Sequence, residues 1–183
     1  MTTFIALLRG INLGPRNKIA MADLRELLEG LGLGDVRTHI LSGNAIFTST
    51  RRSPALIATD IERAIDERFG LDIAVLVRTR DELAAAIDAN PFPGVKGEPS
   101  HCFALFLSEN PDRRKLDAID PAAYKPDEFH LGDRVIYTWL PNGLQGSKVF
   151  AVLSDKRLGV TTTNRSWNTT TKLLELLEGR NPG

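Results

Sequence analysis

The order of apolar and amphipathic segments, which occurs twice along the chain, constrains the fold more than any other feature of the sequence. Short apolar runs typical of buried strands alternate with segments whose apolar residues recur every three or four positions, as in an amphipathic helix. In the first half, the expected elements are strand 4–8, helix 21–31, strands 36–41 and 45–49, helix 54–69, strand 73–77 and a helix that begins at the capping-box spacing of Thr79 and Glu82. This βαββαβ order with one extra helix is typical of a ferredoxin-like sandwich.

A segment rich in proline and glycine separates the two halves. Residues 90–99 contain three prolines and two glycines, so we place a linker at 91–100, between an N-terminal ferredoxin-like half, 1–90, and a C-terminal α/β half, 101–183. In the second half, the expected elements are strand 102–107, helix 110–119, strands 129–131 and 135–139, a helix from 149, a short strand 159–163 and a closing helix 167–177. The sequence therefore predicts an α+β protein with two ferredoxin-like halves, each an antiparallel sheet packed by helices. The repeated order is consistent with a structural duplication.

The composition limits the classes of function. The 183 residues include 23 Lys and Arg and 23 Asp and Glu, and this zero net charge excludes a strongly basic nucleic-acid coat. The single cysteine, Cys102, excludes a disulfide framework. The longest apolar run near the start, 4–8, is too short for a signal peptide or a membrane span, so we expect a cytoplasmic protein with no membrane partner.

Three of the expected strands are apolar on both of their faces: 4–8, 73–77 and 102–107. Both faces of each sheet should therefore be covered. Helices cover one face, and the other is expected to meet the second half or a second copy of the chain. This leaves a homodimer open.

The first of three polar loops that are candidates for ligand binding spans residues 9–18. It carries two glycines and the cations Arg9, Arg16 and Lys18 directly ahead of an expected helix. Backbone amides and cations in such a place can hold an anion. The same spacing also fits a solvated connection whose glycines merely turn the chain, which is the favoured interpretation from spacing alone.

The second loop, 141–148, leads directly into the helix expected from 149. Ser147 fits a helix N-cap, and Lys148 can reach a phosphate held by the first amides of the helix. The loop is not a Walker A motif, because Gly143 and Gly146 are too closely spaced and the serine precedes the lysine.

The third loop, 161–168, precedes the closing helix. Its hydroxyls and amides, together with Arg165 and Trp167, can bind a phosphorylated or planar ligand through charge-assisted hydrogen bonds and stacking. In the structural alternative, Asn164 or Ser166 caps the helix and Trp167 packs in the core. For Trp167 by itself, the core is the favoured interpretation.

The sequence assigns no catalytic, metal-binding or cofactor-binding residue. His39, His101 and His130 have no metal-ligand spacing, and no pair of side chains has a spacing diagnostic of acid–base chemistry. A cysteine on a buried strand, as expected for Cys102, is usually inert.

Taken together, the segments resemble an uncharacterised bacterial family, domain of unknown function sixteen-ninety-seven. The matching motifs are Ala6-Leu-Leu-Arg-Gly-Ile-Asn12, Asn17-Lys18, Met21, Ser42-Gly-Asn44, Asn90-Pro-Phe-Pro93, Ser147-Lys148 and Thr162-Thr-Asn-Arg-Ser-Trp-Asn-Thr169 with Lys172-Leu173. The resemblance covers nearly the whole chain. It implies a two-part α/β protein with ferredoxin-like halves, and no established activity, cofactor or substrate.

The resemblance also implies that the polar loops hold the characteristic positions of the family. The candidate ligand-binding residues are Arg9, Gly10, Asn12, Lys18, Ser42, Asn44, Ser147, Lys148, Arg165, Trp167 and Asn168, with Gly43 in the same motif. Two positions depart from the family pattern. Gly14-Pro15 stands where the family often has two glycines, which weakens the case for a flexible anion loop, and Ser166 stands where it usually has asparagine.

Three hypotheses follow. In the first, the chain binds a phosphate-bearing ligand, a nucleotide or a segment of nucleic acid, in a cationic cleft between the halves. Its cations are Arg9, Lys18, Lys148 and Arg165. In the second, the same residues serve folding, as caps, turns and bridges in a structural or protein-interaction module. In the third, the chain is an enzyme for a small phosphorylated substrate, with His39 or a nearby carboxylate transferring protons.

Overall fold

The computed structural model describes residues 1–92 and 97–179, and its contacts divide the chain into two compact units. Unit 1 comprises Met1–Ala84 and the C-terminal residues from Leu173 onward, and unit 2 comprises Ala85–Lys172. The division of the sequence into 1–90, 91–100 and 101–183 remains a prediction, and residues 93–96 of that linker lie outside the described residues.

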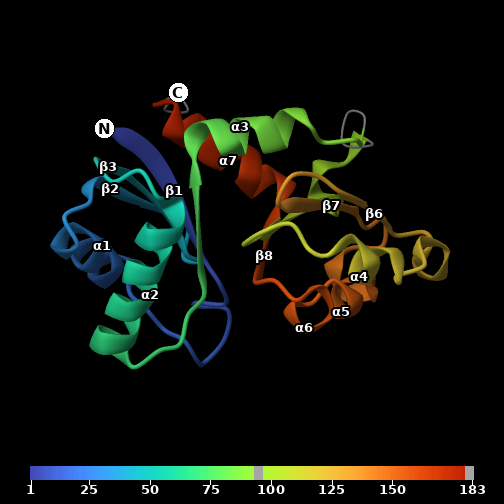
Figure 1. Cartoon of the computed structure of the whole chain (residues 1–183), viewed down its shortest axis with the longest axis horizontal. Coiled ribbons are helices and arrows are strands. Elements are labelled where there is room, and N and C mark those ends of the chain that lie inside the picture. Colours follow the sequence, from blue (N-terminus) through green and yellow to red (C-terminus); the bar gives the residue numbers. More distant parts are fainter. Residues whose placement is uncertain (93–96, 180–183) are drawn as a thin grey trace. The chain divides into compact units, whose positions relative to one another are not determined.

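Unit 1 has the predicted βαββαβ order followed by a helix. Its elements are β1 (Thr2–Leu8), α1 (Met21–Gly30), β2 (Gly34–His39), β3 (Asn44–Ser49), α2 (Pro54–Phe69), β4 (Val75–Thr79) and the first half of α3 (Arg80–Asp88), which belongs to unit 2 from Ala85 onward. The strands form an antiparallel sheet in the order β2-β3-β1-β4. Helices α1 and α2 cover one face of it (Figure 1).

Local sequence signals set the ends of the helices. The Ser53 side chain accepts a hydrogen bond from the amide of Leu56, and Gly70 ends α2 in the left-handed conformation, with φ of 64°. At α3 the capping box is reciprocal. The Thr79 amide donates to Glu82 Oε2 at 2.8 Å, and the Glu82 amide donates to Thr79 Oγ1 at 3.1 Å.

Both faces of β1 are buried, as the apolar pattern predicts. Phe4 and Leu8 lie in the core formed with α1 and α2, whereas Ile5, on the opposite face, is also fully buried. Ile5 pairs with Ile46 of β3 and with Arg78 of β4, so these three residues share the second face. The final turns of the last helix contribute to unit 1 on this side of the sheet, where Leu176 lines a cavity together with Ile46.

Unit 2 has the same strand order at the equivalent positions. Its strands pair antiparallel as β6-β7-β5-β8. The elements are η2 (Pro99–His101), β5 (Cys102–Leu107), α4 (Arg113–Asp117), η3 (Pro121–Tyr124), β6 (Glu128–Leu131), β7 (Val135–Trp139), η4 (Leu144–Gly146), α5 (Val149–Val152), α6 (Asp155–Leu158), β8 (Thr162–Ser166) and α7 (Trp167–Leu177). The predicted fold class is thus confirmed: the protein is α+β, with two similar four-stranded antiparallel sheets packed by helices.

The strands expected at 36–41 and 73–77 are displaced by two residues, to Gly34–His39 and Val75–Thr79, and two other elements differ more from the structure. The helix expected at 110–119 shrinks to α4, because the Asn110 side chain holds the β6–β7 turn instead of starting a helix. Its Oδ1 accepts from the amide of Arg134 at 2.6 Å. The strand expected at 159–163 is wrong by three residues, because Gly159, with φ of 72°, ends α6 and β8 begins at Thr162. Arg165 therefore lies within a strand and not in a loop.

Candidate functional site

In unit 1, the loop 9–20 and the turn 40–43 lie at the same end of the sheet and are joined by one side chain. Asn12 Nδ2 donates to the carbonyl oxygens of Ile19 and Leu41, both at 2.8 Å. Its Oδ1 accepts from the amide of Ile19 at 3.0 Å. We call these two segments together the loop surface. The structure brings the first predicted loop and the hairpin motif into one place.

The hairpin residues of the loop surface have evident structural roles. Gly43 has φ of 86°, and a Cβ there would lie 2.9 Å from Leu8 Cβ, so no other residue fits without a shift. Asn44 is fully buried and donates to the carbonyl oxygen of His39 at 3.1 Å. Ser42 is half-buried beside it. These contacts are those of a stabilised turn.

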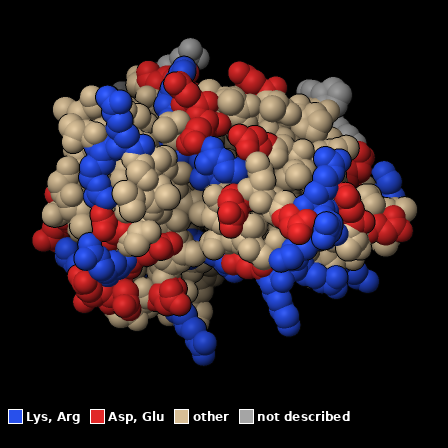
Figure 2. Space-filling view, viewed as in Figure 1, with Lys and Arg blue, Asp and Glu red and all other residues tan. Residues whose placement is uncertain are grey.

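The cations of the loop surface lie in a segment without carboxylates. Acidic and basic side chains are interspersed over the face shown in Figure 2, in keeping with the zero net charge. By contrast, residues 9–22 and 36–52 contain no Asp or Glu at all. Arg9, Arg16 and Lys18 are all exposed, as is Gly10. The two segments of the loop surface therefore carry positive charge and contribute no carboxylate of their own.

The loop surface leads directly into the N-terminus of α1. Its N-cap residue, Ala20, provides no side-chain hydrogen bond to the first amides of the helix. The first carboxylate after the loop, Asp23, lies 3.8 Å from Arg68 of α2. The first amides of α1 therefore have no side-chain cap from Ala20, and the positive end of the helix dipole follows closely after Lys18 in the chain.

The candidate residues of the second loop are in unit 2, at the start of α5. The Ser147 hydroxyl accepts from the amide of Val149 at 3.1 Å, as expected of a residue that caps a helix start. Lys148 is exposed and occupies the N-cap position itself. Because α5 has only four residues, its dipole is small.

The third group of candidates surrounds the start of α7, and two of its members are buried. Arg165 is 7% exposed and donates to Thr163 Oγ1 at 2.9 Å and to the carbonyl oxygen of Asn164 at 2.8 Å. Burial lowers its pKa to about 10, so the guanidinium remains charged at neutral pH. Trp167 packs edge-on against Tyr137 with ring centroids 6.3 Å apart, which confirms the core interpretation. Asn168 is exposed.

The sequence interpretation missed a second buried arginine that matches Arg165. Arg78 lies opposite Ile5 on β4, and Arg165 lies opposite Ala104 on β8, at equivalent registers of the two sheets. Arg78 is 6% exposed, and its Nη1 donates to the carbonyl oxygen of Val77 at 3.0 Å, which is the contact to the preceding residue that Arg165 also makes. The sequence does contain a signal for this pair, because in both halves an arginine is followed by a residue with a hydroxyl group and then by the start of a helix.

The described residues contain neither a reactive thiol nor a cluster suited to a metal ion. Cys102 is buried, and burial raises its pKa to about 11, so the thiol is protonated and unreactive at neutral pH. No group of three or more His, Cys, Asp or Glu within residues 1–92 and 97–179 could hold a metal ion. None of the helices in the described part of the chain is both long and apolar enough to cross a membrane.

Comparisons with known proteins identify a family of unknown function and a solved structure of similar fold. Residues 1–137 match the family described as "Protein of unknown function (DUF1697)". Among solved structures, the conserved bacterial protein SP0830 from Streptococcus pneumoniae is similar, with a TM-score of 0.76 and 24% sequence identity. The similarity covers 96% of this chain and 98% of that one, and at this identity it shows the fold alone. No curated protein matches the sequence.

Proposed function

The chain belongs to the DUF1697 family, whose function is not known, and from its own geometry we propose that it binds a phosphate-bearing ligand, a nucleotide or a segment of nucleic acid. The loop surface of unit 1 supplies the cationic contacts. The observation that carries this proposal is the uncapped N-terminus of α1, which directly follows a loop with three exposed cations and no carboxylate. Amides at a helix start and nearby cations form a common phosphate-binding arrangement.

The Asn12 side chain supports the proposal because it fixes the conformation of the loop. Two of its hydrogen bonds hold the loop to itself, at Ile19, and the third ties the loop to Leu41 of the hairpin turn. A preformed loop loses little conformational entropy when a ligand binds, so less of the binding energy is spent on ordering. Lys148 and Asn168, both exposed in unit 2, remain candidates for further contacts.

The structural alternative is favoured by a different set of residues. Gly43, Asn44 and Trp167 are buried and have packing or turn-stabilising contacts. Ser166 caps α7, because its Oγ accepts from the amide of Thr169 at 3.2 Å. If the chain is a structural or protein-interaction module, all its characteristic residues serve the fold, and no phosphate compound stabilises it.

A thermal-denaturation screen tests the proposal. The probes are inorganic phosphate, adenine and guanine mononucleotides, and short single- and double-stranded oligonucleotides, at low and moderate salt. A ligand present at 100 times its Kd stabilises the fold by about 2.7 kcal/mol, which raises Tm by roughly 5–11 °C in a chain of this size. We expect such a shift with at least one class of probe.

The matched pair of variants localises the binding. Arg9→Ala/Arg16→Ala/Lys18→Ala removes the cations of the loop surface. Arg113→Ala/Arg114→Ala/Lys115→Ala removes the same three charges from α4, where all three residues are also exposed. The first variant should lose the shift, and the second should keep it. No shift with any probe, or an equal loss in both variants, shows that the loop surface does not bind phosphate.

A further inference from the structure

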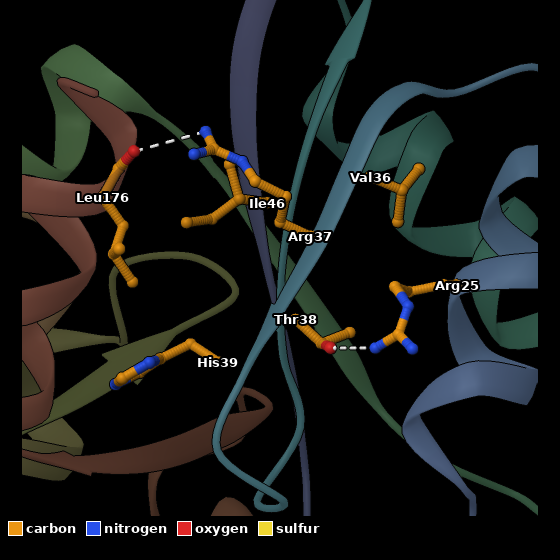
Figure 3. A pocket seen from close by; sticks show the side chains of 7 residues that line it. All are labelled: Arg25, Val36, Arg37, Thr38, His39, Ile46 and Leu176. Carbon is orange, nitrogen blue, oxygen red and sulfur yellow. Dashed lines mark hydrogen bonds between the residues drawn. The ribbon is translucent and has the colours of Figure 1, made fainter. Parts of the chain in front are cut away.

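A second cationic site, outside the loop surface, lies along β2. This strand is at the edge of its sheet, since β3 pairs with one side of it and no strand of the sheet pairs with the other. A cavity of about 370 Å³ surrounds it and is lined by Arg25, Val36, Arg37, Thr38, His39, Ile46 and Leu176. All of these residues belong to unit 1, and Figure 3 shows them together.

Two arginines of this cavity form no ion pair with any described residue. Arg25 Nη1 donates to Thr38 Oγ1 at 2.8 Å, and Arg37 Nη2 donates to the carbonyl oxygen of Leu176 at 3.3 Å. Each guanidinium has five N–H donors, so most of its hydrogen-bonding capacity remains for another group. Other arginines of unit 1 have carboxylate partners: Arg51 and Arg63 pair with Asp60, and Arg68 pairs with Glu26.

The two guanidiniums lie on opposite sides of β2. Arg25 reaches from α1 towards Thr38 on one side, and Arg37 extends on the other side towards the last helix (Figure 3). Successive residues of a strand point to opposite faces of its sheet. A strand added to the edge of β2 would therefore direct two consecutive side chains, one towards each arginine.

We propose that the edge of β2 binds an extended acidic segment of a partner protein, by strand addition, with consecutive carboxylates paired to Arg25 and Arg37. Main-chain hydrogen bonds to an edge strand give affinity in such complexes, and the alternating side chains give specificity. The aliphatic side chains of Val36, Ile46 and Leu176 line the same cavity and suit apolar residues of the segment beside the carboxylates.

The backbone of β2 limits where the segment pairs. The register with β3 shifts between Gly34 and Arg37, and Asp35 has φ of 49°, so this end of the strand is irregular. Such irregularities discourage uncontrolled pairing at sheet edges. The regular part, Arg37–His39, coincides with the two guanidiniums. A neighbouring cavity of about 690 Å³ at the irregular end is lined by three acidic residues, Glu29, Asp35 and Glu178, beside Arg37, which disfavours further carboxylates at that end.

The affinity of the chain for a labelled acidic peptide tests strand addition at β2 directly. The probe is a capped peptide of sequence Thr-Val-Glu-Glu-Val-Thr, compared with its Gln-Gln counterpart and with a version in which proline replaces the second valine. The Glu-Glu peptide should bind about tenfold more tightly than the Gln-Gln peptide, because two partly exposed ion pairs are lost. The proline version should bind more weakly still, because proline cannot donate to a ladder. Equal affinity of the Gln-Gln or proline peptide, or no binding of the Glu-Glu peptide, overturns the proposal.

Variants separate this site from the loop surface. Arg25→Ala and Arg37→Ala should each weaken the Glu-Glu peptide severalfold, and Arg37→Lys, which keeps the charge, should weaken it less. Arg52→Ala removes an exposed cation elsewhere in unit 1 and should change nothing. The Arg9→Ala/Arg16→Ala/Lys18→Ala variant should bind the peptide normally even if phosphate binding proves wrong. Loss of peptide binding in that variant alone overturns the proposal. So does a dimer of the chain, detected by sedimentation, if Arg37→Ala dissociates it but the peptide does not.

Discussion

At the residue scale, Asn12 shows how one side chain can serve both a fold and a binding surface. Its side-chain amide forms hydrogen bonds with backbone groups of its own loop and of the hairpin turn, where Leu41 lies 29 residues further along the chain. A backbone conformation with φ of 56° accompanies these contacts. Asn tolerates this left-handed region better than most residues, which explains why an amide side chain is placed here.

We predict that Asn12→Gly lowers the free energy of unfolding by about 2 kcal/mol, because three hydrogen bonds are lost while the backbone conformation is retained. Asn17→Gly is the matched control. Asn17 also has positive φ, at 55°, but its side chain makes only a long hydrogen bond of 3.5 Å to Gly10. Urea denaturation of both variants measures the difference. Equal losses of stability would mean that the Asn12 contacts contribute little.

Two buried titratable groups should make the free energy of unfolding fall as the pH becomes alkaline. Burial raises the pKa of Cys102 from 9.0 to about 11 and that of Tyr137 from 10.0 to about 12. Above pH 9 the unfolded chain therefore releases protons that the folded chain retains, so the free energy of unfolding falls as pH rises from 9 towards 11. Cys102→Ser should reduce this slope between pH 9 and pH 10, measured by urea denaturation at each pH. An unchanged slope contradicts the assignment to the thiol.

At the element scale, the two units repeat the same junction between last strand and following helix. In unit 1 it consists of Arg78, Thr79 and α3, and in unit 2 of Arg165, Ser166 and α7. The hydroxyl of the second residue accepts a hydrogen bond from the amide three residues later in both units. The repetition of register and contact, and not only of element order, supports the expectation of a structural duplication.

Thr79→Ala and Ser166→Ala should therefore destabilise the chain by similar amounts, about 1 kcal/mol each, because each removes a helix N-cap. Guanidinium denaturation of the two variants provides the comparison. Ser154→Ala is a suitable control, since Ser154 is the N-cap residue of α6 but makes no side-chain cap hydrogen bond. A loss in only one of the two capping variants would show that the junctions are not energetically equivalent.

The elements that the sequence predicts best are those whose ends carry local signals. The strand 102–107 agrees with β5 to the residue, and α2 lies between a capping serine and a left-handed glycine, both evident in the sequence. Contacts between distant segments were not predictable. Asn110 resembles a helix start locally, yet it is used by the β6–β7 turn 23 residues away. The burial of Arg165 follows from a strand boundary displaced by Gly159, which only the packed sheet defines.

At the scale of the whole molecule, the contact-defined units do not follow the order of the chain. Leu173 and Leu177, at the end of α7, are buried and belong to unit 1, although α7 begins in unit 2. The sequence predicts a second half that runs from 101 to 183, and nothing in the periodicity of a helix indicates which sheet each of its turns contacts.

We predict that a chain truncated after Lys172 has a less stable unit 1, although every strand of that unit is retained. Native-state hydrogen exchange should show lower protection of β2 and β3, because Arg37 loses its contact to Leu176 and Ile46 loses the neighbouring Leu177. Protection within the α1–α2 core should change less. If β2 and β3 exchange at the rates of the full chain, the end of α7 does not stabilise the sheet.

The shared helix also has a consequence for biosynthesis. A ribosome adds about 5–20 residues per second, so roughly 5–20 s separate the synthesis of Thr79, at the end of β4, from that of Leu173. During this interval the nascent first sheet has all four of its strands but lacks the helical turns that belong to its second face. The side of the sheet that carries Ile46 is then open to chaperones, and it is completed only after α7 has been synthesised.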